Sequence, residues 1–128
     1  MIDNPIKWLI KFLNNKGYEV YRQGSLSEGV PYPASFFTYY NTYTEYDAYF
    51  DNSATTLEYA VSLYFYSTDI SQLYTVFEQM RKELKAYGWL CPDAGADTPS
   101  ADKEHYGRVF EIYFKETRYI LWQTKLKE

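Results

Sequence analysis

Residues 56–67 constrain the fold more than any other segment, because apolar side chains alternate there with polar, small or tyrosine side chains. Such alternation is typical of a strand that has one face in a core. The core-facing set is Leu57, Tyr59, Val61, Leu63 and Phe65, and the opposite set is Glu58, Ala60, Ser62, Tyr64 and Tyr66. We therefore expect a long strand whose second face suits a solvent surface that a partner can also cover.

An amphipathic helix is predicted over residues 4–16. Asp3 or Asn4 can cap it, Pro5 suits its first turn, and Gly17 is a natural stop. Its apolar positions repeat at helical spacing, so the helix should lie across a sheet and leave its lysines in solvent.

A second helix is predicted to begin at Asp69, with Gln72 as its capping-box partner, and to end at Gly88. Its apolar stripe consists of Ile70, Leu73, Tyr74, Phe77, Met80, Leu84 and Tyr87. This stripe also requires an apolar surface to cover.

The rest of the chain is rich in strand-forming residues interrupted by turns. Strands are predicted over 18–22, over 34–50 as two strands with a break near 41–45, and over 89–92, 108–117 and 119–126. The loop over 93–105 is long for so small a domain, and such loops are usually functional or disordered. The order of elements predicts one α+β domain over residues 1–128, with a mostly antiparallel sheet and two main helices packed on it.

The composition supports a globular chain with unusual aromatic content. Hydrophobic residues make up 46% and charged residues 23% of the 128, whereas aromatic residues reach 21%, with 16 Tyr. No segment approaches the ~20 apolar residues that a bilayer crossing needs, and the N-terminus lacks a signal-peptide pattern, so we expect a soluble protein without membrane contact. Cys91 is the single cysteine, which fits a reducing compartment.

The charge is unevenly distributed. The formal net charge of −4 argues against a binder of duplex DNA. No Lys or Arg occurs between Arg22 and Arg81, although that interval carries several acids. One negative and one positive surface would suit head-to-tail contacts between subunits, while acids placed by chance in polar turns explain the same pattern.

Catalytic and cofactor chemistry find little support in the residues. His105 is the single histidine, and with Asp97, Asp102 and Glu104 it could form a metal site or an acid–base pair. Because these residues fall in the predicted loop, ordinary loop polarity is the favoured interpretation. The glycines are isolated, so no phosphate-binding loop is present. We expect no enzyme, no cofactor and no metal.

The tyrosines have three possible roles. Stacking on single-stranded nucleic acid requires a basic groove, and acids flank the aromatic run instead. Sugar or protein binding by a monomeric module stays open. An interface between copies of the chain is favoured, because tyrosine buries a large ring and keeps a hydroxyl for a partner. The candidate interface residues are Tyr39, Tyr43, Tyr46, Tyr49, Tyr64, Tyr66 and Tyr113.

The order of elements resembles that of the small tail-completion proteins of long-tailed bacteriophages, most nearly the tail terminator type. The resemblance is carried by the opening helix over 6–14, the segment Pro31-Tyr32-Pro33-Ala34-Ser35-Phe36-Phe37, the strand-to-helix unit over 57–87 and the Gly88-Trp89 exit. It spans most of the chain and rests on pattern, since these families have no invariant catalytic motif.

The resemblance implies a structural virion protein, made in the bacterial cytoplasm, that forms a ring at the junction of tail and head. Such rings are commonly hexameric, cap the tail tube and contact head-completion proteins. A head-side connector or neck protein is the alternative within this class. Acids in the cation-free interval could line the channel so that passing DNA is not held, and the candidates are Glu45, Asp47, Asp51 and Glu58.

Overall fold

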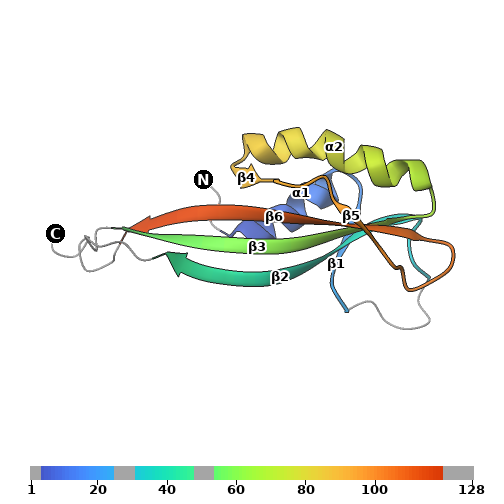
Figure 1. Cartoon of the computed structure of the whole chain (residues 1–128), viewed down its shortest axis with the longest axis horizontal. Helices are drawn as coiled ribbons and strands as arrows, with labels where there is room; N and C mark the ends of the chain where they lie inside the picture. Colours follow the sequence, from blue (N-terminus) through green and yellow to red (C-terminus); the bar gives the residue numbers. More distant parts are fainter. Residues whose placement is uncertain (1–3, 25–30, 48–53, 120–128) are drawn as a thin grey trace.

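In the computed structural model, which describes residues 4–24, 31–47 and 54–119, two helices pack on one sheet (Figure 1). The elements in chain order are α1 (Pro5–Asn15), β1 (Glu19–Arg22), β2 (Ser35–Asp47), β3 (Ala54–Ser67), α2 (Ile70–Ala86), β4 (Trp89–Leu90), β5 (Ala96–Thr98) and β6 (Tyr106–Tyr119). The α+β class is confirmed. The edge strand predicted over 119–126 lies, beyond its first residue, outside the described residues.

The sheet is mostly antiparallel, as predicted. Its strand order is β1-β2-β3-β6-β4, and β5 also pairs with β6. Only the pairing of β1 with β2 is parallel. β2, β3 and β6 are the long strands, and they continue together past β1 and β5 (Figure 1).

Both helices begin at side-chain caps. Asn4 Oδ1 accepts a hydrogen bond from the Lys7 N–H at 3.1 Å, and Asp69 Oδ1 accepts one from the Ser71 N–H at 3.0 Å. The predicted capping box is wrong in its second half. Gln72 Oε1 accepts from Ser35 and Ser67 hydroxyls instead, so this side chain fastens α2 to the ends of β2 and β3.

The core lies between the helices and one face of the sheet. Leu9 and Leu13 of α1 and the α2 residues Leu73, Val76, Phe77, Met80 and Leu84 meet Phe37, Val61, Leu63, Phe65, Phe110, Ile112 and Phe114 of the sheet. Within the predicted stripe of α2, Ile70, Tyr74 and Tyr87 are instead about half exposed. The predicted core-facing residues of the strands are therefore confirmed. The buried stripe of α2 is narrower than the apolar stripe predicted from its sequence.

The segment predicted as two aromatic strands is one strand with a β-bulge. Asn41 pairs with Val61 and Tyr43 pairs with Ala60, so Thr42 is an extra residue. When its side-chain amide is oriented to satisfy both polar atoms, Asn41 Nδ2 donates to the carbonyls of Ala60 and Tyr43 at 3.0 and 2.8 Å. The polar residues near 41–45 thus change the register without ending the strand.

Candidate functional site on the helix-free face of the sheet

The face of the sheet opposite the core carries no helix among the described residues. The strand register places there Phe36, Thr38, Tyr40, Tyr43 and Glu45 of β2, Glu58, Ala60, Ser62, Tyr64 and Tyr66 of β3, and Val109, Glu111, Tyr113 and Lys115 of β6. We call this set the helix-free face. An antiparallel sheet can leave one face to solvent, so the side chains on it decide what it can do.

Four of the seven candidate tyrosines gather on this face, namely Tyr43, Tyr64, Tyr66 and Tyr113. Tyr39 and Tyr46 do not, because they pair with the core-side residues Leu63 and Leu57. The bulge separates Tyr43 from Tyr39, since one extra residue moves every following side chain to the other face, whereas Tyr43 and Tyr46 are three residues apart and lie on opposite faces of the strand in any case. Tyr49 lies outside the described residues.

Two of the four candidate acids meet at one point of the helix-free face. Glu45 and Glu58 are directly opposite each other on β2 and β3, and Lys115 is opposite Glu58 on β6. The pKa of Tyr43 is raised above its ordinary value, first by desolvation and then by electrostatic interactions with Glu58, Tyr113 and Glu45. Asp47 is described only through its backbone as the last residue of β2, and Asp51 lies outside the described residues.

A stack of four aromatic rings crosses the other end of this face. Tyr32 stacks on Phe36, Phe36 on Tyr66, and Tyr66 on Tyr64, with centroid separations of 5.4, 5.2 and 6.3 Å. Tyr66 is only 8% exposed, so it is not the solvent-facing residue that its strand position predicts. Because the inner rings contact each other through their faces, they do not present those faces to a sugar or a base.

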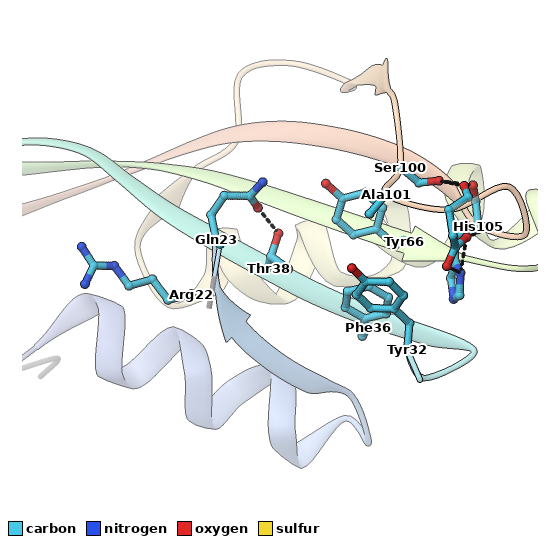
Figure 2. A pocket seen from close by; sticks show the side chains of 11 residues that line it. Arg22, Gln23, Tyr32, Phe36, Thr38, Tyr66, Ser100, Ala101 and His105 are labelled. Atoms are coloured by element: carbon cyan, nitrogen blue, oxygen red, sulfur yellow. Dashed lines mark hydrogen bonds and ion pairs between the residues drawn. The ribbon is translucent and has the colours of Figure 1, made fainter. Parts of the chain in front are cut away.

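A small pocket opens beside this stack (Figure 2). Its volume is about 180 Å³, below the ~300 Å³ at which small-molecule sites usually begin. Thr38 Oγ1 donates to Gln23 Oε1 in its wall. Burial raises the pKa of the Tyr66 hydroxyl, although hydrogen bonds with Gln23 and Thr38 act in the opposite direction. The polar groups of the pocket are thus largely engaged with one another.

His105 closes the far wall of the pocket and joins two distant segments. Its Nδ1 lies 2.9 Å from both carboxylate oxygens of Asp102, and its Nε2 lies 2.7 Å from the carbonyl oxygen of Pro33. Burial disfavours the charged form of Asp102, but hydrogen bonds from the His105 ring and from the backbone N–H groups of His105 and Glu104 outweigh it and lower the pKa of Asp102. The side chain of His105 is 6% exposed, which indicates a fixed position.

This arrangement differs from a nucleophile activated by a histidine. The hydroxyl of Ser100 donates to the backbone carbonyl of His105 at 2.7 Å and not to its ring, and both ring nitrogens have a partner from the chain. Asp97 pairs instead with Arg108 at 2.6 Å. Among the described residues, no group of three or more His, Cys, Asp or Glu side chains is placed to hold a metal ion.

Residues 93–105, predicted as one long loop with ordinary loop polarity, contain a short strand and a turn held by hydrogen bonds. β5 pairs with β6 inside this segment, and the contacts of Asp102 and His105 hold its end against Pro33. Sequence reasoning missed the pocket, because its residues come from four separated segments. The one local signal was the Asp102-x-x-His105 spacing, which suits a turn in which the carboxylate accepts backbone N–H groups.

The comparisons with known proteins do not assign a family. Neither the scan against protein-family models nor the search of curated proteins finds a match to this chain. Within residues 4–24, 31–47 and 54–119, neither helix has the length and apolar character needed to span a membrane.

Proposed function

We propose that the chain is a structural protein that assembles with copies of itself into a ring of the tail terminator type. In this role the ring caps the tail tube of a long-tailed bacteriophage and joins it to the head-completion proteins. The observation that carries the proposal is the helix-free face, where Tyr43, Tyr64 and Tyr113 lie on a part of the sheet that no described helix covers. Tyrosine is enriched in protein interfaces, where it buries a large rigid ring.

The acids support the same role. Glu45 and Glu58 bring two like charges together on the helix-free face, where the adjacent Lys115 balances only part of them. A subunit that holds two carboxylates side by side tolerates their repulsion more easily if the surface stays hydrated. An open channel provides such a surface, and an acidic wall would not retain passing DNA.

The competing functions have weaker support from the geometry. A monomeric binding module that used the ring stack needs accessible ring faces or a larger pocket beside them, but the rings contact each other and the pocket beside the stack has a volume of about 180 Å³. A head-side connector or neck protein would use the same ring contacts. The geometry of one subunit does not distinguish the two roles, so the position within the particle has to be measured directly.

Native mass spectrometry of the full chain tests the ring. We expect one defined oligomer at micromolar concentration, with six copies as the first expectation. Tyr43→Ser combined with Tyr113→Ser should shift it to monomer with little change in thermal midpoint, whereas Tyr74→Ser is the control because Tyr74 is half exposed on α2. A wild-type chain that stays monomeric would contradict the proposal.

The place in the virion needs a separate experiment. An antibody against the chain, applied to tailed particles from the organism that carries it, should label the junction of tail and head in electron micrographs. Label along the tail or on the capsid, or none on any particle, would contradict the terminator role even if the chain forms rings.

A further inference from the structure

A groove of about 460 Å³ lies where β4 meets the helix-free face and the C-terminal half of α2. β4 pairs with β6 and packs against α2 (Figure 1). The groove is lined by Arg81 and Lys85 of α2, by Leu90 and Pro92 of the β4 segment, and by Lys115 and Glu58 of the sheet. We call it the cationic groove, because three of its side chains are cations and Glu58 is the one acid among the described residues that line it. Its volume lies within the ~300–1,000 Å³ that is usual for binding sites.

Both cations of α2 act at the floor of the cationic groove. The Arg81 guanidinium donates from Nε and Nη2 to the Cys91 carbonyl at 3.1 and 2.8 Å, so its direction is fixed before anything binds. Burial raises the pKa of the Cys91 thiol, whereas the charges of Arg81 and Lys85 act in the opposite direction, which places both charges near this residue. A guanidinium that is already fixed loses little freedom when it takes up an anion, and this favours binding.

The cationic groove has an excess of positive charge. Lys115 is opposite Glu58 in the register of β3 and β6, so the charge of this lysine is partly offset. Arg81 and Lys85 are four residues apart on one face of α2, where like charges repel each other. The macrodipole of α2 favours cations near its C-terminal end, and an anion beside them would also remove their repulsion. The groove therefore attracts a negatively charged partner.

Exposed apolar surface lies beside these charges and indicates the kind of partner. Leu90 is 51% exposed, and Pro92 is also exposed. A phosphate backbone gains nothing from such surface, and the carboxylate of Glu58 repels it. An extended peptide directs successive side chains to opposite sides, so acidic and apolar residues in alternation can satisfy both parts of the groove.

We propose that the cationic groove binds an extended acidic segment, with apolar residues between its acids, from a protein other than this chain. Its acids lie against the two cations of α2 and Lys115, and its apolar side chains lie against the exposed leucine and proline. A second copy is a poorer occupant. Its paired carboxylates, Glu45 and Glu58, lie next to its own Lys115, so docking them would bring that lysine toward the same cations. The interaction requires one subunit only, so it goes beyond the proposed self-assembly and does not depend on it.

Fluorescence polarisation with a labelled peptide tests the groove. The probe is fluorescein-Glu-Glu-Leu-Glu-Leu-Glu-Glu-amide, and in the comparison peptide serine replaces both leucines. Lys85→Glu with Lys115→Glu should raise the dissociation constant of the probe at least about tenfold. Leu90→Ser keeps every charge and should raise it about threefold, because less apolar surface is buried. Lys7→Glu with Lys11→Glu, on exposed positions of α1, makes the same change in net charge and should leave the dissociation constant unchanged.

Several results would overturn the proposal. The first is a wild type that does not bind the probe. An equal affinity for the serine peptide, or an equal loss in the α1 variant, would leave only a general attraction of charge. Tighter binding of a labelled oligothymidylate than of the probe would show a nucleic-acid site instead. If native mass spectrometry shows that the groove variants lose an oligomer that the wild type forms, the groove joins copies of the chain.

Failure of the ring is a separate result. A wild type that stays monomeric but binds the probe with the expected dependence on the groove contradicts self-assembly and supports the acidic partner. A wild type that forms rings but ignores the probe has the opposite meaning. Circular dichroism confirms that each variant is folded before its affinity is interpreted, and Leu90→Ser tests the groove without a change of charge.

Discussion

Gly95 immediately precedes β5. Replacing it by alanine should destabilise the protein for two separable reasons. Its φ of +93° is in the left-handed region, which costs an L residue about 1–2 kcal/mol. A Cβ atom would also lie 2.5 Å from Cε1 of Phe110, whereas ordinary contacts are 3.4–4 Å. Phe110 cannot easily retreat, because it is 1% exposed and its ring is stacked on Phe77 with a centroid separation of 3.6 Å.

The size of the effect follows from three contributions. Overpacking of a core typically costs 1–3 kcal/mol, and the reduced freedom of the unfolded chain returns about 0.4–1 kcal/mol. We expect Gly95→Ala to lower the free energy of unfolding by about 2–4 kcal/mol. Gly17 is the control, since it has φ of +97° and nothing within 4 Å of the added Cβ, so Gly17→Ala carries the backbone cost alone. Gly88→Ala should fall between them, because its Cβ would lie 3.3 Å from the Phe114 ring.

Urea unfolding followed by tryptophan fluorescence measures the series. The expected order of destabilisation is Gly95, then Gly88, then Gly17. If Gly95→Ala loses no more stability than Gly17→Ala, the contact between Phe110 and Phe77 does not fix the ring, and the packing argument is refuted.

Two further predictions concern the pocket. The pKa of Asp102 in the folded state lies below its ordinary value of 3.8. The ionised carboxylate therefore stabilises the fold fully above that value, and this stabilisation is lost as the pH falls through the folded-state pKa. Asp102→Asn should flatten the dependence of the free energy of unfolding on pH between pH 5 and 2, measured in urea, and parallel curves for the variant and the wild type would contradict this. Tyr66→Ala removes a ring that lies between Phe36 and Tyr64, and it should lower the free energy of unfolding in urea by about 3 kcal/mol. Tyr66→Phe keeps the stack and should lower it by about 1 kcal/mol or less. Equal losses of stability would show that the hydroxyl, and not the ring, is important.

The sequence could predict those elements whose signal is local. The alternation in β3 and the caps of α1 and α2 depend on neighbours within one strand or one turn, and the structure confirms them. Tyr66 lies on the predicted face opposite the core, but the expected solvent exposure of its side chain was wrong, for a reason that alternation cannot supply. The face of a strand is set by its own residues, but burial on that face depends on which rings arrive from other segments.

The pocket could not be predicted, because its contacts join segments far apart in the chain. The ring of His105 bonds to the Pro33 carbonyl 72 residues away. Loop composition indicated solvated polarity at His105, and only the folded chain brings the acceptor to it. The sequence likewise shows Tyr32 in a proline-rich segment, but its stacking on Phe36 depends on the path of the backbone from that segment into β2.

The bulge at Thr42 decides which face receives Tyr43, and this yields a test that links register to function. Deleting Thr42 removes the extra residue and leaves Tyr43 opposite Ala60, so the strand becomes regular with Tyr43 still on the helix-free face. Deleting Thr44 instead lets Thr42 take the place opposite Ala60 and turns Tyr43 toward the helices, while Glu45 stays opposite Glu58. Both deletions shorten β2 by one residue, so they are matched. If Tyr43 contributes to assembly, the Thr42 deletion should keep the wild-type mass and the Thr44 deletion should lose it. Equal masses for two folded variants would remove Tyr43 from the interface.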